Sequence, residues 1–286
     1  MLSYRHAFHA GNHADVLKHF VLLQIVDHLK QKEAPIWYID THAGAGCYNL
    51  ESEQAQKLGE FRDGIGRLWQ RQDLPPALAQ YVELVKKLNP RGPLQRYPGS
   101  PWLAAETLRE SDRLRLFEMH PNEVKLLAGN FKNGGRRLII TADDGFAGLK
   151  ALLPPPSRRA LVLIDPSYET KDDYFNVVKA LEEALKRFAT GTYAIWYPRL
   201  SKAESRRLPE KLAKLPAQSW LHVTLSVSKP AAGSFGMHGS GMFILNPPWT
   251  LADALKKTLP WLSTALAQGE GAGFTLEHSE DKATPK

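Results

Sequence analysis

The stretch ALVLIDPSY, from Ala160 to Tyr168, contains the residues that decide the fold. Its run of five apolar residues predicts a short strand buried on both faces, as in a parallel sheet. The strand leads into Asp165, Pro166, Ser167 and Tyr168, so a carboxylate, a proline and an aromatic ring follow its carboxyl end. Open α/β sheets bind ligands at this edge, and these groups suit a flat base with an exocyclic amine. The alternative is an ordinary β–α turn in which Asp165 caps the next helix.

The length, composition and charge of the chain limit its number of domains and the kind of partner it can bind. A chain of 286 residues with 43% hydrophobic content can form one large domain or two small ones. Its 37 Lys and Arg outnumber 30 Asp and Glu, and the net charge of +7 fits an anionic partner. No apolar run is long enough for a membrane span, so we expect nucleic acid and not a membrane. The single Cys47 and the polar N-terminus predict a cytoplasmic protein without disulfides or a signal peptide.

Strand-like and helix-like segments alternate along most of the chain. Strands are predicted at 36–40, 114–118, 138–141, 160–164 and 192–197. The repeated β–α units predict a parallel sheet. Two further strands, 220–227 and 241–245, have no helix between them and predict an antiparallel pair at the sheet edge. Residues 49–110 interrupt the alternation and predict a helical insertion, and the polar segment 269–286 is predicted to be disordered.

Acidic residues follow four of the predicted strands, at Asp40, Glu118, Asp144 and Asp165. Each alone could be a helix cap. In a parallel sheet all four would lie at one edge, where their charge costs energy unless a cationic or hydrogen-bond-rich ligand fills the cleft. An adenosine sulfonium fits, because it offers ribose hydroxyls, an adenine amine, a positive sulfur and an ammonium group. A nicotinamide dinucleotide fits less well, since its anionic pyrophosphate prefers helix amides.

The turn after the first predicted strand reads THAGAG, residues 41–46. Because Gly44 and Gly46 lack a Cβ atom, they let backbone amides approach a ligand and tolerate positive φ. The turn lacks the later glycine of the dinucleotide-binding pattern G-x-G-x-x-G. It is therefore either a cofactor loop of another kind or an ordinary glycine-rich turn.

Four histidines near the N-terminus, His6, His9, His13 and His19, raise the question of a metal site. Their spacing matches no common ligand pattern, and no cysteine or paired carboxylate completes a set. We therefore predict no metal. The ordinary interpretation is that these histidines are solvated or cap a helix, and the alternative is a pocket position for His19.

Taken together, these motifs resemble a known family. The order D-x-x-x-G-x-G, then acids after the second and third strands, then D-P-S-Y, resembles the class I S-adenosylmethionine-dependent amino-methyltransferases. More closely, MLSYRHAFHAGNHADVLKH, DTHAGAG, YPGSP and LNPPW resemble the ribosomal RNA large subunit methyltransferase J family, which N6-methylates one adenine of 23S ribosomal RNA. The likeness covers nearly the whole chain except the tail. It implies a Rossmann-like methyltransferase domain over residues 1–268 that contains the insertion at 49–110.

The resemblance also implies a binding site for S-adenosyl-L-methionine. Its residues would be His19, His42, Ser100, Glu118, Asp144 and Gly145, together with Gly44 and Gly46 of the glycine turn. Glu118 would bind the ribose hydroxyls, and Asp144 with Gly145 would hold the adenine ring.

The same resemblance makes Asp165 the catalytic carboxylate. The carbonyl of Pro166 would accept a second N–H bond from the target amine, and Tyr168 would stack on the base once it leaves its helix. Tyr4 and Lys18 would lie on the substrate side. The partner implied is 23S ribosomal RNA, with no obligate protein partner evident.

Basic residues could contact the phosphates of that RNA. The candidates are Lys18, Arg158, Arg159, Arg199, Lys202, Arg206 and Arg207. For any one of them, a solvated helix face is the ordinary interpretation.

The chain departs from the family pattern at one place, where Ser167 replaces the second proline of D-P-P-Y. A serine loosens the backbone and adds a polar group, which affects loop rigidity but leaves the acid and the ring intact. A rival motif, starting at Asn246, reads N-P-P-W. It follows a strand predicted to run antiparallel, so it should point away from the cleft, and an amide cannot accept a proton. We therefore favour Asp165.

Two other function classes stay open on the sequence alone. One is a catalytically weak or inactive RNA-binding protein on a methyltransferase scaffold, because of Ser167. The other is an NAD-dependent oxidoreductase, which shares the type of sheet but would need the phosphate loop that this chain lacks.

Overall fold

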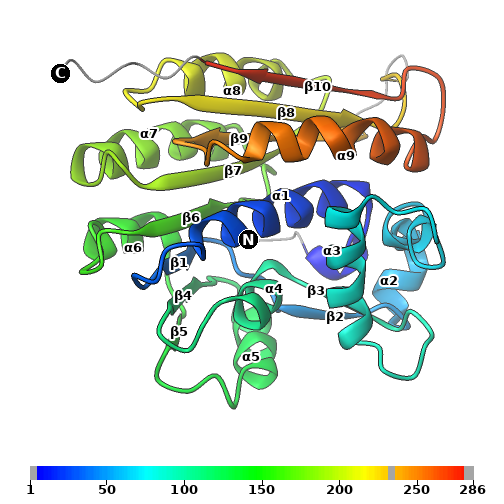
Figure 1. Ribbon diagram of the computed structural model, residues 1–286, viewed down its shortest axis with the longest axis horizontal. Coiled ribbons are helices and arrows are strands. Elements are labelled where there is room, and N and C mark those ends of the chain that lie inside the picture. Colours follow the sequence, from blue (N-terminus) through cyan, green and yellow to red (C-terminus); the bar gives the residue numbers. More distant parts are fainter. Residues whose placement is uncertain (1–4, 231–235, 280–286) are drawn as a thin grey trace.

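A single sheet organises the computed structural model, which describes residues 5–230 and 236–279. From one edge to the other, the eight strands found in these ranges are β10 (Gly273–His278), β8 (Trp220–Ser226), β9 (Gly239–Leu245), β7 (Thr192–Arg199), β6 (Ala160–Ile164), β1 (Trp37–Asp40), β4 (Arg113–Phe117) and β5 (Leu138–Thr141) (Figure 1). The five strands from β7 to β5 are parallel, whereas β9 is antiparallel to β7 and β8 to β9. This confirms the predicted class I methyltransferase fold, a mainly parallel sheet with an antiparallel end.

Parallel pairing brings the carboxyl ends of β1, β4, β5 and β6 to one edge, as the sequence predicts. The rival motif at Asn246 lies elsewhere. Because β9 is antiparallel to β7, it ends on the side of the sheet opposite to the carboxyl ends of the parallel strands. Asn246 there donates hydrogen bonds to the carbonyls of Ala189 and Gly191, at 2.8 and 2.7 Å, and accepts one from the Gln218 N–H at 3.0 Å. Its amide therefore joins three chain segments far from the cleft.

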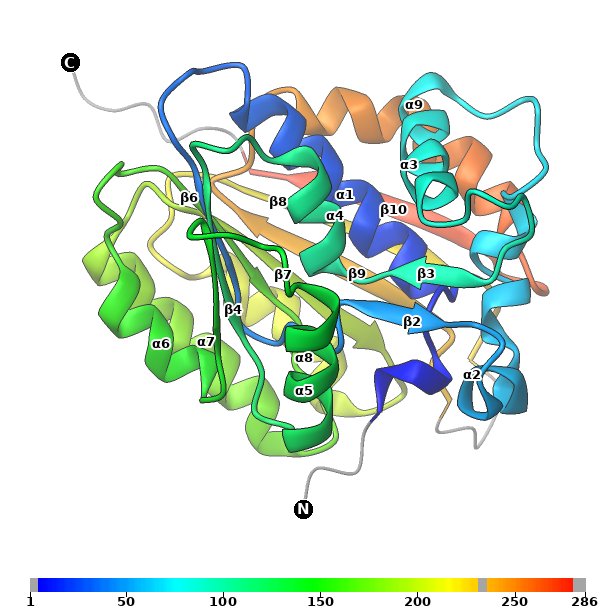
Figure 2. The same cartoon turned by 90° about the horizontal axis from the view of Figure 1, so that it is seen from below.

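Helices cover both faces of the sheet (Figure 2). α1 (His13–Leu29), α4 (Ser100–Thr107) and α9 (Leu251–Ala265) pack on one face, and α6 (Gly145–Leu152), α7 (Lys171–Arg187) and α8 (Ala203–Ala213) pack on the other. In α1, 13 of the 17 residues are buried, because the sheet covers one side and α4, α9 and the inserted segment cover the rest. Four of the buried residues are polar or charged, namely His13, Asp15, Lys18 and His19. No helix of the described ranges is both long and apolar enough to cross a membrane.

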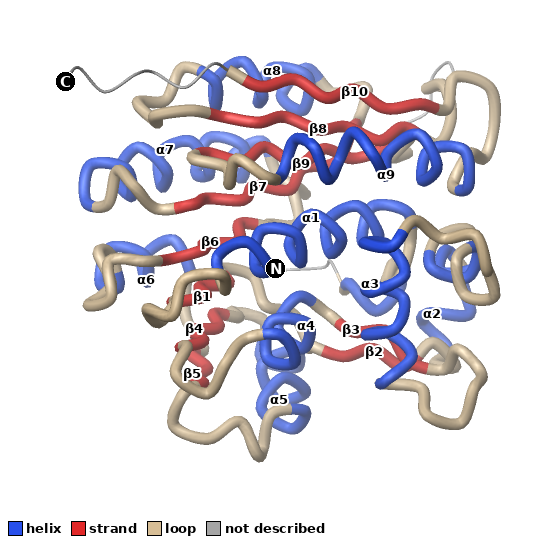
Figure 3. The backbone as a smooth tube through the Cα atoms, viewed as in Figure 1, coloured by secondary structure: helices blue, strands red, loops and turns tan. Residues whose placement is uncertain are grey.

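The segment between β1 and β4 leaves the sheet and returns to it (Figure 3). It contains β2 (Cys47–Asn49), α2 (Glu53–Leu58), η2 (Glu60–Arg62), η3 (Ile65–Arg67), α3 (Pro76–Lys87) and β3 (Arg96–Pro98) before α4. β2 and β3 pair antiparallel as a small separate sheet. This hairpin-like closure puts the start and the end of the mainly helical segment side by side, close to the sheet edge that the acids occupy.

One prediction for the C-terminal part is wrong. Residues 273–278 are not disordered: they form β10, which pairs antiparallel with β8 from Gly273 opposite Ser226 to His278 opposite Leu221. Without β10, the edge of β8 would have unpaired backbone groups, and the tail pairs with them while Leu276 packs on the core. The polar composition of the tail therefore did not predict its structure. The predicted antiparallel pair of β8 and β9 does form at this end of the sheet, and β10 adds one more strand outside it. The last part of the predicted tail, 280–286, lies outside the described residues.

Gly145 begins α6 at a point where the helix almost touches the turn after β1. A Cβ atom on Gly145 would lie 2.3 Å from the carbonyl oxygen and 2.6 Å from the Cα of Thr41. We expect Gly145→Ala to lower the free energy of unfolding by about 1–3 kcal/mol, because backbone must move to admit the methyl group. Urea unfolding followed by circular dichroism measures the change.

The matched control is Gly129→Ala, in α5 (Pro121–Asn130), where a Cβ atom would meet nothing within 4 Å. Alanine is the better helix former, so this variant should gain about 0.5–1 kcal/mol. Equal effects of the two substitutions would contradict the assignment of Gly145 to a packing constraint.

Candidate active site

A pocket of about 310 Å³ lies at the carboxyl edge of the parallel strands, within the size range of small-molecule sites. Residues far apart in the chain meet in it. Of the residues singled out from the sequence, Lys18, His19, His42, Gly44, Ser100, Glu118, Asp144, Asp165 and Pro166 line its wall. The structure therefore brings the glycine turn and the D-P-S-Y loop to one cavity. The individual roles assigned to these residues stay predictions.

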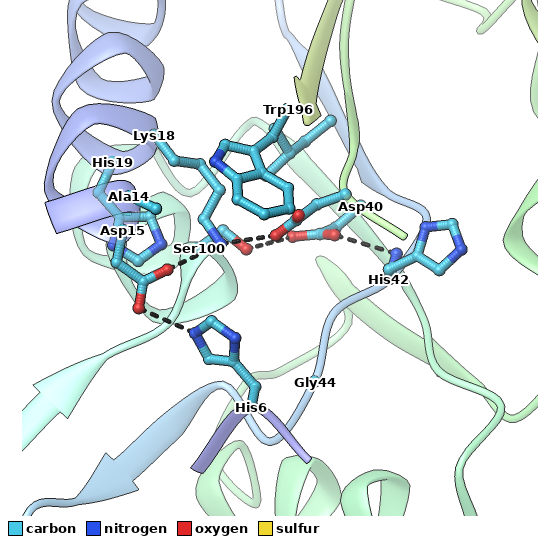
Figure 4. A network of polar contacts seen from close by, with 12 residues as sticks. His6, Ala14, Asp15, Lys18, His19, Asp40, His42, Gly44, Ser100 and Trp196 are labelled. Atoms are coloured by element: carbon cyan, nitrogen blue, oxygen red, sulfur yellow. Dashed lines mark hydrogen bonds and ion pairs between the residues drawn. The ribbon is translucent and has the colours of Figure 1, made fainter. Parts of the chain in front are cut away.

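A buried ammonium organises one side of the pocket (Figure 4). Lys18 Nζ lies 2.5 Å from Asp165 Oδ2 and 2.9 Å from Asp15 Oδ1, and its side chain is 6% exposed. Asp15 Oδ2 in turn accepts hydrogen bonds from the Gly11 N–H at 2.9 Å and the ring of His6 at 2.8 Å. Lys18 and Asp15 lie one turn apart on α1, so the helix presents a prearranged ion pair to the end of β6.

The ionisation of Asp165 reflects two opposed influences. Burial raises the pKa of this carboxyl, and the Lys18 ammonium acts against that rise by favouring the charged form. The pKa of Lys18 itself is raised, because the two carboxylates outweigh its own burial. The three groups thus hold a compact charge arrangement in which one ammonium faces two carboxylates. Lys18 lines the pocket and bonds to the acid. Its place on the substrate side stays a prediction.

A second network fixes the end of β1. Asp40 is fully buried and accepts hydrogen bonds from Tyr38 Oη and Ser100 Oγ, both at 2.7 Å, and from the His42 N–H at 3.2 Å (Figure 4). Burial raises the pKa of Asp40, and these donors limit the rise. All its contacts are internal. Asp40 therefore ties the start of α4 to the turn after β1 instead of facing the pocket.

Glu118 joins the loops after β1 and β4. Its Oε2 accepts a hydrogen bond from the Gly44 N–H at 2.8 Å, and its Oε1 accepts one from the His120 N–H at 2.7 Å. Burial is the main cause of its raised pKa. Gly44 has a φ of +58°, a backbone conformation that favours glycine, and this conformation aims its amide at the carboxylate.

Two buried histidines line the pocket in their neutral form. Burial lowers the pKa of His19 to about 3 and that of His42 to about 4. His19 Nδ1 hydrogen bonds to Tyr97 Oη at 2.8 Å, and the ring of His42 meets Phe146 edge-on with centroids 5.1 Å apart. His42 Nδ1 in turn hydrogen bonds to Thr41 Oγ1 at 2.8 Å. Neither ring carries a charge at neutral pH, so each has its Nε2 left for a ligand, as a donor or an acceptor according to the tautomer.

Three predicted residues do not line the cavity. Gly46, at a φ of +74°, packs against α5, where a Cβ would lie 2.7 Å from the ring of Phe131. Gly145 packs against Thr41, as described above. Tyr168 is 2% exposed: its ring packs on Tyr174 and its Oη donates to the Trp196 carbonyl at 2.7 Å. Its expected stacking on a base is therefore not possible in this structure, because no face of the ring is open. Tyr4 lies outside the described residues.

Other pocket residues were not predicted. His6, Phe146 and Asn176 line the cavity, as does Glu123, which is 8% exposed and whose Oε2 has no hydrogen-bond partner within the described ranges. Glu123 follows Glu118 by five residues in the first turn of α5, where an acid is normally explained by the helix dipole. The sequence alone does not distinguish an acid that stabilises the start of the helix from an acid that binds a ligand.

The N-terminal histidines take part in contacts with acids. His6 bonds to Asp15, and His9 Nδ1 lies 3.0 Å from Glu60 of the inserted segment. Nowhere in residues 5–230 and 236–279 do three or more His, Cys, Asp or Glu side chains gather as metal ligands would. The contacts with Asp15 and Glu60 therefore join the N-terminal segment to α1 and to the insertion.

Known proteins share this chain's sequence and architecture. A family model described as "Ribosomal RNA large subunit methyltransferase D, RlmJ" matches residues 33–278. The chain belongs to this family. Ribosomal RNA large subunit methyltransferase J of Haemophilus influenzae is 49% identical over 278 residues, which cover 97% of this chain and 98% of that protein. The protein of the same name from Escherichia coli is 49% identical over 266 residues, covering 93% and 94%.

A solved relative agrees with the fold. The crystal structure of protein LPL1258 from Legionella pneumophila matches with a TM-score of 0.86 at 34% sequence identity, covering 96% of this chain and 99% of that one. The resemblance stated from the sequence is thereby confirmed. Because the chain belongs to a methyltransferase family, the oxidoreductase alternative is not supported.

The neutral state of His19 predicts how stability depends on pH. Its folded pKa of about 3 lies below the ordinary value of 6.5. As pH falls below 6.5 the unfolded chain takes up a proton that the folded chain refuses, so stability is lost between pH 6.5 and 3. We expect His19→Gln to make this loss shallower, by up to about 1.4 kcal/mol per pH unit. Urea unfolding at several pH values between 4 and 7 measures the slope. An unchanged slope would show that the ring is not held neutral.

Proposed function

We propose that this protein transfers the methyl group of S-adenosyl-L-methionine to the N6 amine of one adenine in 23S ribosomal RNA, as a cytoplasmic enzyme. The observation that carries the proposal is the carboxylate of Asp165, which faces a pocket built from cofactor-type loops while Lys18 holds its other oxygen. Membership of a ribosomal RNA methyltransferase family supports the substrate class, and the names of the relatives support the large-subunit RNA.

The donor set of the pocket suits S-adenosylmethionine. Carboxylates of Glu118, Glu123 and Asp144 line one side, and a cofactor with two ribose hydroxyls, an amine and an ammonium needs such acceptors. The buried Oε2 of Glu123, which has no hydrogen-bond partner among the described residues, is one acceptor that a bound polar group would satisfy. Neutral His19 and His42 add mixed donor and acceptor groups without repelling a cation. We therefore assign the cofactor to these residues, with Glu118 at the ribose.

When bound, S-adenosylmethionine supplies an electrophilic methyl group. Adenine N6 is a weak nucleophile, because its lone pair is delocalised into the ring. Asp165 Oδ1 and the carbonyl of Pro166 can accept its two N–H bonds and so direct the lone pair out of the ring plane, toward the methyl group. As positive charge develops on N6, the carboxylate stabilises it. The proton released then passes to Asp165 or through water.

Lys18 positions Asp165 for this task. By bonding to Oδ2 it leaves Oδ1 to face the substrate, and its charge keeps the buried carboxyl ionised. Tyr168 supports the same loop from behind: its backbone adopts a φ of +54°, and its hydroxyl bonds to Trp196. We infer that Tyr168 holds the loop that carries Ser167, and that the polar Ser167 faces the pocket it lines.

The basic residues divide between the two edges of the sheet. Arg158 and Arg159 precede β6, at the edge opposite the pocket, and Arg159 donates to the carbonyls of Leu29 and Ala34. Arg159 therefore has a structural role, which corrects its predicted contact with phosphate. Arg199 ends β7 at the pocket edge and Lys202 follows the strand, so we propose that RNA approaches from there.

Transfer of a tritiated methyl group from S-adenosylmethionine to unmodified 23S ribosomal RNA tests the function. The wild type should produce N6-methyladenosine, identified by mass spectrometry of the digested RNA. Asp165→Asn should lower the single-turnover rate by about 100- to 1,000-fold, because the amide gives neither the charge nor a base. Asp172→Asn, an exposed acid nearby on α7, is the charge-matched control and should retain the rate.

The alternatives have distinct outcomes in this assay. RNA binding without any transfer by the wild type would indicate an inactive scaffold. A near-normal rate for Asp165→Asn, with cofactor and RNA both saturating, would remove Asp165 from the mechanism while leaving the overall reaction in place.

Removing the buried ammonium should shift the pH dependence of the rate. In Lys18→Met, Asp15 and Asp165 lose their shared cation, so the already raised pKa of Asp165 rises further. Because the ionised carboxylate is the active form, kcat should fall at neutral pH and recover as pH increases. A pH–rate profile under single-turnover conditions measures this shift. A uniformly reduced rate with an unshifted profile would assign Lys18 a purely structural role.

A further inference from the structure

A second cavity, of about 670 Å³, lies on the other face of the sheet from α1. Its floor is formed by β7, β9, β8 and β10, and one wall is formed by Arg206, Pro209, Glu210 and Ala213 of α8. None of these side chains lines the pocket of Asp165. We call this cavity the α8 groove. The α8 groove and the pocket of Asp165 are therefore separate hollows, and the proposed reaction uses only the pocket.

The strand register shows how the groove runs. Arg199, Gly239 and Ser226 form one row across β7, β9 and β8, and this row lies at the edge that carries the pocket. Four pairs further along the two strands, His222 and Phe243 are paired, and Trp220 lies beyond them toward the opposite edge. The groove therefore begins beside the mouth of the proposed RNA entrance and extends along the strands away from it.

Aromatic rings form the floor in the middle and at the far end. The rings of Trp220 and Phe243 stack with centroids 5.4 Å apart, and those of His222 and Phe243 are also 5.4 Å apart. Tyr197 continues the row: its Oη lies 2.7 Å from His222 Nε2. Gly241 allows this arrangement, because a Cβ there would lie 2.4 Å from the Tyr197 ring. Trp220 is only partly covered, so its ring forms a surface on which a planar group can stack, and the His222 side chain close by is 12% exposed.

The charged residues of the groove are distributed along it. Arg199, Arg206 and His238 belong to the end near the pocket edge, and His238 Nδ1 is buried there without a partner among the residues described. Glu277, paired with His222 across β10 and β8, lies at the aromatic end, and its side chain is 64% exposed. Cationic donors at one end and rings with a carboxylate acceptor at the other match a nucleotide, whose phosphate is anionic and whose base is flat and carries N–H donors.

We propose that the α8 groove binds one nucleotide from a single-stranded segment of the same RNA whose adenine enters the pocket. The phosphate of this nucleotide would lie at Arg199 and Arg206, and its base would lie on Trp220 beside His222. This inference rests on the proposed function, since it takes the RNA substrate as given. An apolar peptide fits less well, because the groove contains two arginines and two glutamates besides its rings. The opening beside the pocket edge gives one RNA strand access to both sites.

A charge-matched pair of variants on α8 tests the phosphate end. Arg206 and Lys211 are both exposed on this helix, but only Arg206 lines the groove. Arg206→Ala should weaken RNA binding about tenfold and reduce the slope of log Kd against log salt by about 0.7, as expected for one lost phosphate contact on a single strand. Lys211→Ala should leave both unchanged. Fluorescence anisotropy with an RNA fragment that the wild type methylates measures both quantities.

Photocrosslinking tests the aromatic end. RNA substrates carrying 5-iodouridine at successive positions near the target adenine should crosslink to Trp220 or His222 from one position, and Trp220→Leu should remove or redirect the crosslink. The rate at saturating RNA should be retained in all these variants, because the pocket is untouched, whereas KM should rise. If a free mononucleotide binds over Trp220 and RNA does not crosslink there, the groove is a site for a small molecule and not for an RNA strand. That result would overturn the proposal.

The outcomes separate this inference from the proposed function. If the wild type methylates ribosomal RNA but Arg206→Ala and Lys211→Ala behave alike and no crosslink reaches the groove, the inference alone fails. If the wild type transfers no methyl group to RNA, the proposed function fails first.

Discussion

The whole site depends on one buried ammonium. Lys18 lies between the carboxylates of Asp15 and Asp165, and these contacts join the first helix to the end of the fourth parallel strand, β6, 147 residues later in the chain. Burial of three charges is costly, and replacing such a cluster by apolar residues often costs a protein nothing. The cluster is therefore better explained by position than by stability: it fixes where the acid of the D-P-S-Y loop points.

The rest of the cavity is built on the same plan, in which an acid at a strand end fixes a neighbouring loop. Asp40 holds Ser100 and the turn after β1, and Glu118 holds the amides of Gly44 and His120. In both, the carboxylate is satisfied by protein donors, and burial raises its pKa. The acids at the sheet edge thus differ in function. Asp40 only shapes the loops, Glu118 shapes them and also lines the pocket, and Asp165 keeps one oxygen available to a substrate.

Much of this could be predicted from the sequence, because alternating strands and helices determine where strand ends lie. That rule alone brings Glu118, Asp144 and Asp165 to one edge. It does not specify side-chain direction, so it could not show that the ring of Tyr168 faces inward, or that Lys18 bonds to an acid 147 residues away. It also missed β10, because whether a polar tail pairs depends on a free strand edge elsewhere in the fold. Glu123 was missed for a related reason, since an acid in the first turn of a helix has an adequate local explanation.

The burial of α1 has a consequence for how the chain reaches its native state. This helix lies near the start of the sequence, and it packs against β9, more than two hundred residues later. During synthesis, its apolar surface and its lysine leave the ribosome long before the strands that cover them exist. The nascent polypeptide must therefore carry an exposed hydrophobic segment through most of translation, the kind of intermediate that chaperones protect from aggregation.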